Sequence, residues 1–591
     1  MFAPEFETVL NVSLNVSEEE RMKSEILDTG YDRPGNTWEI IFRYSEFPAS
    51  FFREYPELPV VRLIGNYGIV RIPEGLLGEL AAAQGVIYME IPKRLYFGKN
   101  LQEGGRVQER SVNSLSATGV PLLMEQLGGK LTGRGVLLGI ADSGIDVFHA
   151  AFQTRTGETR VRVLWDQASD RIYEKEEIDR YLEQVRQGNL KASDIPEVFR
   201  DLSGHGTAVA GIAMEYAPEA ELVVVRLAQS GADEYVRTSS LMQAVDFLVR
   251  KAAETGMPMA LNLSIGNNYG SHTGRSLLST YLSEIALQER VTICVGSGNE
   301  GGRPVHASVD LTDTIRNSRP ESGTSGENAY GVLLPIAEKQ VSINIQIWKE
   351  YADVFRVELT APDGTVFPVF GEDSLLLGQK NGQSNLRQFR SRGTQIVAFN
   401  GFPTPYQPLQ ELFLDLIPAV NYVDSGNWRL TFYPVRLISG HVEMWLPAGG
   451  LLNRGSGFAV PSSDHTLTVP SASDRVITVA AYNSMTRSYA PFSGRGFTAF
   501  TNQVKPDLAA PGVNIMAPVA GSASGYEVFT GTSFAAPAVT GAAALLMQWG
   551  IVQGNDLWLY GSRMKSLLHR QAREIGAFQQ YPNEFVGYGV L

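Results

Sequence analysis

The spacing of hydrophobic and polar positions changes along the chain, and the first change sets off residues 1–101. Apolar runs at 38–43 and 86–91 predict strands, and a hairpin is expected at 60–72. A helix is predicted at 73–84, because proline begins the run and glycine follows it. This order of elements predicts a small α+β domain of the split βαβ type.

Beyond this zone, short apolar runs alternate with segments of helical period. Strands are predicted at 135–141, 222–227, 260–264 and 291–295, and helices at 206–216, 241–255 and 275–288. The same alternation returns in residues 463–591. The predicted fold class is therefore α/β, a doubly wound and mainly parallel sheet built from residues 102–309 and 463–591. Residues 104–113, which are polar and contain glycine, are expected to form a linker.

Between these two parts, residues 310–462 follow a period of two. Strands are predicted at 341–348, 353–359, 428–433 and 440–445, with turns such as Pro362-Asp-Gly364 between strands. A run of strands without a helical segment is typical of a sandwich or jelly roll. We therefore expect an all-β, jelly-roll-like domain inserted into the α/β domain.

Composition and charge narrow the possible functions. A hydrophobic fraction of 43% is normal for a globular protein and argues against extended disorder. The net charge of −13, without a long basic run, argues against nucleic acid as a partner. The single cysteine, Cys294, cannot form an internal disulfide, and its apolar surroundings predict a buried core residue.

Two targeting features are not expected. The first residues lack a basic segment followed by an apolar one, so no secretory signal is predicted. The longest apolar stretch, 535–549, falls short of the roughly 20 residues of a membrane span and is rich in alanine and glycine. It predicts a buried helix within a large domain.

Three motifs carry the candidate chemistry. Gly139-Ile-Ala-Asp-Ser-Gly places Asp142 at the carboxyl end of a predicted strand, where α/β sheets build their sites. Gly204-His-Gly-Thr places His205 at the start of a helix. Gly531-Thr-Ser-Phe-Ala-Ala-Pro places Ser533 at the start of a helix of small residues. The order Asp, His, Ser is the order of the subtilisin triad.

With these motifs, the chain resembles the subtilisin family of serine peptidases, over about residues 114–309 and 463–591. The resemblance implies that Ser533 attacks a peptide carbonyl, that His205 takes the serine proton, and that Asp142 orients the imidazole. It further implies that Asn299, in Gly296-Ser-Gly-Asn, donates a hydrogen bond to the oxyanion, together with the backbone N–H of Ser533.

The resemblance also locates substrate binding. The segment Leu261-Asn-Leu-Ser-Ile-Gly266 is similar to the strand that pairs with an extended substrate in this family. An ordinary core strand is the alternative. The substrate-binding residues that the resemblance implies are Ser264, Ile265, Gly266, Gly296 and Gly298.

Residues 1–101 resemble the prodomain of these enzymes, and autoprocessing is expected between Tyr96 and Gly105. Together with the β insert and the Gly-His-Gly-Thr-Ala-Val-Ala-Gly motif, they resemble the Csp-type germination proteases of anaerobic spore formers. In that subfamily the cleaved prodomain tends to stay bound, and the substrate is the zymogen of a spore cortex-lytic enzyme. The implied location is the spore, with a cytoplasmic or released protein as alternatives.

Other functions stay open at this point. One alternative is a general protein-degrading bacterial subtilase, and another is a prodomain-blocked pseudoprotease that acts as a signalling module. The insert could bind carbohydrate through Trp348, Tyr351, Trp428 and Trp445, although sandwich core is the commoner role. The histidines outside the motifs show no ligand spacing, so no metal or other cofactor is expected, and no calcium site is assigned.

Overall fold

The computed structural model describes residues 2–98, 100–101, 111–191, 194–231, 234–312, 329–371, 385–404 and 406–591. The chain forms two compact units. The first contains Met1–Arg94, Asn268–Ser271 and Arg303–Ser463, and the second contains Leu95–Asn267, His272–Gly302 and Asp464–Leu591. The predicted linker at 104–113 lies mostly outside the described residues.

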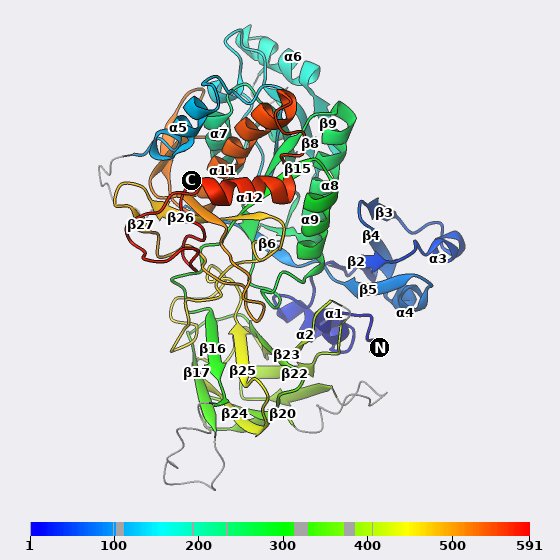
Figure 1. The fold of residues 1–591 in the computed structure, drawn as a ribbon. Helices are drawn as coiled ribbons and strands as arrows, with labels where there is room; N and C mark the ends of the chain where they lie inside the picture. Colours follow the sequence, from blue (N-terminus) through cyan, green and yellow to red (C-terminus); the bar gives the residue numbers. More distant parts are fainter. Residues whose placement is uncertain are drawn as a thin grey trace. The chain divides into compact units, whose positions relative to one another are not determined.

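The N-terminal part of the first unit is a five-stranded antiparallel sheet with short helices (Figure 1). Its elements are α1 (Thr8–Ser13), α2 (Glu18–Lys23), β1 (Tyr31–Asp32), β2 (Thr37–Tyr44), α3 (Ala49–Glu54), β3 (Val60–Leu63), β4 (Tyr67–Pro73), α4 (Leu77–Ala82) and β5 (Val86–Glu90). The predicted strands and hairpin are confirmed, and α4 lies within the helix predicted at 73–84. Helices α1 and α2 were not predicted, although Ser17 and Glu20 form a capping box that marks the start of α2.

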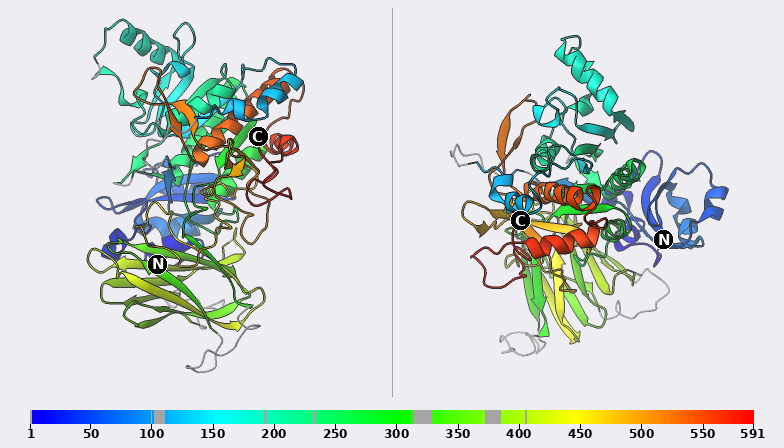
Figure 2. Two further views of the ribbon diagram at one scale, coloured as in Figure 1. Left: turned by 90° about the vertical axis from the view of Figure 1, so that its left-hand side faces the viewer. Right: turned by 45° about the horizontal axis from the view of Figure 1, so that its top comes forward.

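The rest of the first unit consists of two antiparallel sheets, drawn in green to yellow in Figures 1 and 2. One has the order β16-β25-β18-β23-β22-β21 and the other β17-β24-β19-β20. The strands are β16 (His306–Asp310), β17 (Tyr330–Ile336), β18 (Ile343–Glu350), β19 (Val354–Thr360), β20 (Val366–Phe370), β21 (Leu386–Arg390), β22 (Thr394–Asn400), β23 (Leu409–Pro418), β24 (Gly426–Arg436) and β25 (His441–Trp445). Apolar side chains from both sheets share one core.

An inner strand of the larger of these sheets, β23, is buried on both faces. Every residue of β23 is buried, although a period of two identifies only one apolar face. Leu414 lies in the core between the two sheets. Phe413 lies in a separate core with Phe6 and Leu10 of the N-terminal part. The N-terminal part therefore covers the outer face of this sheet.

The burial of the insert's tryptophans argues against the alternative that they bind carbohydrate. Trp348, Trp428 and Trp445 are 8%, 0% and 1% exposed, and Tyr351 is half-buried. Three of the four aromatics are thus core residues and cannot present a ring face to a sugar.

The second unit is built on a sheet with the order β27-β26-β15-β13-β7-β10-β8-β9, with β28 paired to β26. Its strands are β7 (Leu137–Asp142), β8 (Val161–Asp166), β9 (Arg171–Glu174), β10 (Glu221–Arg226), β13 (Met259–Leu263), β15 (Val291–Gly296), β26 (Ile477–Asn483), β27 (Ser488–Tyr489) and β28 (Leu508–Pro511). Only the end strands β9 and β27 pair antiparallel among the described ladders of this sheet. The predicted parallel sheet is confirmed.

Two helices rich in small residues pack together against this sheet (Figure 2). They are α7 (His205–Tyr216) and α11 (Thr532–Met547); the other main helices are α6 (Lys175–Arg186), α8 (Thr238–Thr255), α9 (Leu277–Gln288) and α12 (Gly561–Gln571). A Cβ at Gly541 would lie 2.6 Å from the Ala213 carbonyl and from the Tyr216 Cβ, so glycine is needed for the close approach of the helices.

Helix α11 is the apolar stretch that the sequence marked as a core helix. Within the part of the chain that the structure describes, Thr532–Val552 is long and apolar enough to cross a membrane, but 89% of its apolar window is buried inside the protein. Cys294 on β15 is also fully buried, as predicted, and burial raises the pKa of its thiol to about 12.

Candidate active site

Three neighbouring parallel strands end where the predicted site residues lie. Strand β7 ends at Asp142, β13 is followed by Ser264, and β15 is followed by the loop that carries Asn299. These strands are adjacent in the order β15-β13-β7. The chain adds β10 and β8 on one side of β7 and β13 on the other, so Asp142 stands at a topological switch point, where α/β sheets bind ligands.

Helix α7 begins at His205, directly after the left-handed Gly204. The His205 Nδ1–H donates to Asp142 Oδ1 at 2.7 Å. A Cβ at Gly206 would collide with the Gly144 carbonyl, so this glycine lets the helix approach the end of β7. The two motifs that the sequence singled out therefore meet through a direct hydrogen bond.

The environment of His205 stabilises its charged form. Burial lowers the pKa of the imidazole, but the charge of Asp142, its hydrogen bond and the charge of Asp201 outweigh burial and raise the pKa above its ordinary value. The Nε2 atom is buried and has no hydrogen-bond partner among the described residues. It is available to accept a proton from a nucleophile.

A hydrogen-bonded support that the sequence analysis missed holds this pair. Asp201 accepts hydrogen bonds from Ser143 Oγ and from the backbone N–H and Oγ1 of Thr207. Ser143 Oγ in turn accepts from the Gly206 N–H, and the Ser143 N–H donates to Asp142 Oδ1. Ser143 and Thr207 stand inside the quoted motifs, but Asp201 lies in a loop without a pattern that would reveal it.

Ser533 is the second residue of α11 and is 4% exposed. Asn299 is held beside it by Thr532, whose backbone N–H and Oγ1 both donate to Asn299 Oδ1 at 3.0 Å. Because Oδ1 is occupied, the Nδ2 donors of Asn299 are left for an oxyanion. Thr532 is a positioning residue that the sequence analysis did not identify.

The predicted substrate strand holds a peptide in the structure, and this peptide is part of the chain itself. Strand β14 (Ile265–Gly266) pairs antiparallel with β6 (Arg94–Phe97), with Ile265 opposite Phe97 and Gly266 opposite Tyr96. On its other side β6 borders β12 (Tyr235–Arg237), which in turn pairs with β11 (Gln229–Ser230), so β6 is an inner strand of a four-stranded sheet. Ser264 Oγ donates to the Ser533 carbonyl at 3.0 Å, which ties the substrate strand to α11.

The chain then continues past the serine. A Cβ built at Gly98 would lie 2.6 Å from Ser533 Oγ and 3.0 Å from Asn299 Nδ2. Beyond it, the Leu101 N–H donates to the Thr530 carbonyl at 3.1 Å, and Asn100 exchanges hydrogen bonds with Thr530 and Val528. Part of the interval predicted for autoprocessing, Tyr96 to Gly105, lies outside the described residues.

The remaining predicted substrate-binding residues are two glycines: Gly296 is the last residue of β15, and Gly298 lies between this strand and Asn299. A Cβ at Gly296 would lie 3.2 Å from Thr532, and one at Gly298 would lie 2.5 Å from Thr468. Both glycines therefore permit close packing beside the serine. Both belong to the motif Gly296-Ser-Gly-Asn, from which a position in the substrate site was predicted.

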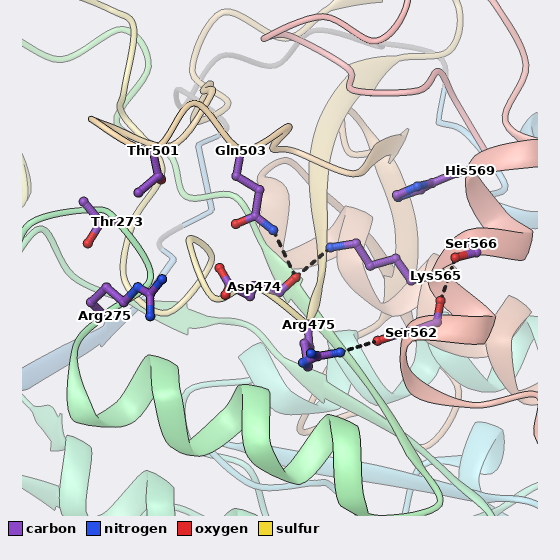
Figure 3. A pocket seen from close by; sticks show the side chains of 10 residues that line it. All are labelled: Thr273, Arg275, Asp474, Arg475, Thr501, Gln503, Ser562, Lys565, Ser566 and His569. Atoms are coloured by element: carbon purple, nitrogen blue, oxygen red, sulfur yellow. Dashed lines mark hydrogen bonds between the residues drawn. The ribbon is translucent and has the colours of Figure 1, made fainter. Parts of the chain in front are cut away.

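The second unit has one cavity beside the catalytic histidine and another that contains none of the predicted site residues. One of about 610 Å³ is lined by Asp201, Gly204 and Phe529, next to His205 along the chain. The other, of about 510 Å³, is shown in Figure 3 and contains none of the predicted site residues. In Figure 3, Arg475 donates to Ser562 Oγ and Lys565 to the Asp474 carbonyl, so part of its lining is engaged within the protein.

Comparisons with known proteins cover most of the chain. A family model described as "Subtilase family" matches residues 133–398 and 453–589, and one described as "Csp protease B prodomain" matches residues 4–93. The solved structure of the Clostridium perfringens CspB protease is 30% identical, has a TM-score of 0.70, and covers 81% of this chain and 95% of its own.

More distant relatives are also proteases by name. The C5a peptidase of Streptococcus pyogenes is 22% identical over 472 residues, which are 74% of this chain and 36% of that protein. The serine protease AprX of Bacillus subtilis is 34% identical over 130 residues, 19% of this chain and 29% of that protein. The chain thus spans about a third of the length of the C5a peptidase that it matches.

Proposed function

Because the chain belongs to the subtilase family of serine peptidases and carries a Csp-type prodomain, we propose that it is an active endopeptidase with Asp142, His205 and Ser533 as its triad. The observation that carries this proposal is the 2.7 Å hydrogen bond between His205 and Asp142, with Nε2 of the imidazole left unpaired among the described residues. A pseudoprotease would not need to preserve this arrangement.

The mechanism follows from these positions. Ser533 Oγ attacks the carbonyl carbon of the substrate while His205 Nε2 accepts its proton. Asp142 keeps the imidazole in the tautomer that carries a proton on Nδ1, and its charge favours the imidazolium that forms. The imidazolium then protonates the leaving amine, and water hydrolyses the acyl-enzyme with His205 again as the base.

Stabilisation of the oxyanion is the task of Asn299. Its Nδ2 group and the backbone N–H of Ser533, at the start of α11, supply the two donors. Thr532 fixes the amide of Asn299 in advance, so little reorganisation is needed when the charge develops. Loss of one such donor costs on the order of 3 kcal/mol of transition-state stabilisation; the measured example for this principle is a subtilisin.

The first substrate is the enzyme's own chain. Tyr96 and Phe97 pair with β14, and Leu101 bonds to Thr530, two residues before Thr532 and three before Ser533. This path supports autoprocessing between Tyr96 and Gly105. Residues 1–101 would then be a cleaved prodomain.

The cleaved prodomain stays bound through residues 310–462, a jelly-roll-like insert in this proposal. Its support is the core that Phe6 and Leu10 share with Phe399 and Phe413 inside the first unit. The Ser24 hydroxyl also donates to the buried Asp415 at 2.6 Å. Cleavage of the chain near residue 98 leaves all these contacts in place.

The further substrate is a protein, and the resemblance to CspB favours the zymogen of a spore cortex-lytic enzyme, with the protease located in the spore. A general protein-degrading subtilase is the second candidate, because the backbone pairing along β14 recognises any extended peptide.

The test incubates the purified protease with such a zymogen and, in parallel, with casein. Ser533→Ala is the control in both reactions. Cleavage of one bond in the zymogen, with casein intact, supports the proposal. Degradation of casein at many sites supports the second candidate instead, and no cleavage of either protein contradicts both.

A further inference from the structure

The cavity shown in Figure 3 contains none of the triad residues and is lined by basic side chains. Its volume of about 510 Å³ lies within the range of about 300–1,000 Å³ that is typical of small-molecule sites. Arg275, Arg475 and Lys565 contribute cationic groups, and Asp474 is the one acidic residue among the described residues that line it. Because the whole chain carries a net charge of −13, this excess of positive charge is a local feature.

The two arginines have no carboxylate partner in the part of the chain that the structure describes. Arg275 precedes α9 and is exposed, and no described residue forms a hydrogen bond or an ion pair with its guanidinium. Arg475 precedes β26, and its Nη1 donates to Ser562 Oγ at 3.2 Å. Both guanidinium groups keep donors for a ligand, and their fork matches the oxygens of a phosphate or carboxylate group.

Lys565 differs from the arginines, because its charge is balanced within the protein. Its Nζ lies 2.9 Å from Oδ1 of the buried Asp507 and donates to the Asp474 carbonyl, also at 2.9 Å. Gln503 Nε2 donates to the same carbonyl at 3.4 Å. These bonds hold the segment that carries Asp474 and Arg475 against α12. This wall of the cavity is therefore ordered before a ligand arrives, which lowers the cost of binding.

A glycine brings Arg275 close to the same segment. Gly274 has a φ of +76°, and a Cβ there would lie 2.5 Å from the Ala472 carbonyl and 3.4 Å from Asp474 Oδ1. A side chain at position 274 would therefore push the segment with Arg275 away from the segment with Arg475. The two arginines line one cavity because of this close approach. Their like charges repel each other, and a bound anion removes this repulsion.

The remaining donors favour a phosphate group as the ligand. Ser562 Oγ accepts from Arg475, so its own O–H can still donate. Ser562 also stands in the first turn of α12, where the helix dipole favours an anion. One carboxylate presents two oxygens in a plane and is satisfied by a single guanidinium fork. A phosphate group, with its tetrahedral oxygens, can accept from both arginines and from the serine hydroxyl together.

We propose that this cavity binds a phosphate group, either the free ion or the phosphomonoester of a small molecule, through Arg275, Arg475 and Ser562. The site goes beyond the proteolytic function and does not depend on it. Asp474 opposes the anion and limits its affinity. The bound phosphate joins the segment before α9 to the segment before β26, so binding stabilises the second unit against unfolding.

Titration calorimetry of the full chain tests the site. Ser533→Ala is the parent, because it lacks the nucleophile and so stays a single species. The probes are inorganic phosphate and glycerol 3-phosphate, at a constant ionic strength set with chloride, and glycerol is the uncharged control. We expect saturable binding of both phosphates and no binding of glycerol. Tighter binding of glycerol 3-phosphate would identify an esterified phosphate as the ligand, and tighter binding of inorganic phosphate would identify the free ion.

Variants of the lining assign the binding to this cavity. Arg275→Gln and Arg475→Gln should each weaken phosphate binding about tenfold, because each removes hydrogen bonds from a charged donor. Asp474→Asn should strengthen binding about two- to fivefold, because it removes the opposing charge. A gain in affinity cannot arise from damage to the fold. Arg570→Gln, at an exposed position of α12 outside the lining, is the matched control and should bind like the parent.

Four results would overturn the proposal. The first is the absence of saturable binding of either phosphate. The second is equal affinity in the parent, Arg275→Gln and Arg475→Gln, which would place the phosphate elsewhere. The third is tighter binding of succinate than of both phosphates, which would assign the cavity to carboxylates. The fourth is a melting temperature of the second unit that does not rise with phosphate concentration, because a ligand of the folded state must raise it.

Discussion

The imidazole of His205 and the carboxylate of Asp142 are both buried, and their Nδ1 and Oδ1 atoms are 2.7 Å apart. The two residues come from different elements, the first turn of α7 and the last residue of β7. The close approach of the two elements depends on Gly206, which has no side chain to collide with Gly144. Hydrogen bonds of Ser143 with Asp201 and with the Gly206 N–H hold the two elements in place. Such a pair is oriented before a substrate arrives, which is the condition for efficient proton transfer.

Asp142→Asn should lower the rate of autoprocessing by about 10⁴-fold, because an amide stabilises the wrong tautomer of His205. The rate is measured from the appearance of the small fragment during translation. Asp363→Asn, in an exposed turn of the first unit, is the matched control and should leave the rate unchanged. A loss of less than tenfold in Asp142→Asn would contradict the assigned role.

Asn299→Ala should reduce the turnover rate by about 10²- to 10³-fold, with little change in KM, because its donor acts on charge that develops in the transition state. Thr532→Val should give a smaller loss in the same direction, since it removes one of two hydrogen bonds to Asn299 Oδ1. Thr532→Ser retains the hydroxyl and should stay near wild type. Equal rates for the valine and serine variants would exclude the positioning role.

Activity should rise with pH through a value above the ordinary imidazole pKa of 6.5. His205 must be neutral to accept the serine proton, and Asp142 and Asp201 raise its pKa. Below that pKa the imidazole is protonated and the rate falls. Asp201→Asn removes one raising charge, so its profile should shift to lower pH. The initial rate of autoprocessing, measured across pH 5 to 9 for both proteins, checks the shift.

The stability of the first unit should fall as pH rises from about 4.5 to about 8. Burial, and next the charge of Glu7, raise the pKa of Glu90 to about 8, and burial raises the pKa of Glu411 to about 7. Within this window the folded unit keeps protons that the unfolded chain has released. The free energy of unfolding therefore decreases with increasing pH.

Calorimetry of the Ser533→Ala chain at several pH values tests this dependence. Glu90→Gln and Glu411→Gln cannot ionise, so each should flatten the decline of the melting temperature with pH. Glu57→Gln, at an exposed position, should keep the slope of the parent. A melting temperature that rises between pH 5 and 8 would show the opposite sign and refute the account.

The sequence predicted the parallel sheet well, because buried strands read as continuous apolar runs and the site residues follow them directly. The β insert was harder. No strand was predicted at β23, where both faces are buried: Leu414 packs in the core between the sheets, and Phe413 packs with Leu10, far away in the sequence. Local patterns carry no information about such a long-range contact.

In the candidate site, too, local sequence patterns identified some residues and long-range contacts determine the roles of others. Short motifs rich in glycine and other small residues identified four of the site residues directly from the sequence: Asp142, His205, Ser533 and Asn299. Asp201 acts only through tertiary contacts, and nothing in the residues beside it indicates this role. Gly98 is one glycine among 59, and its meaning depends on the fold that brings it to Ser533.

The most direct test of the central claim compares wild type with Ser533→Ala by intact mass, each with and without a fluorophosphonate probe. The account predicts that wild type splits into a small fragment, ending between Tyr96 and Gly105, and a large fragment, while Ser533→Ala stays whole. Labelling of the large fragment would show an open site, and its absence a retained, inhibiting prodomain. A wild type that neither splits nor labels would contradict the claim that this chain is an active protease.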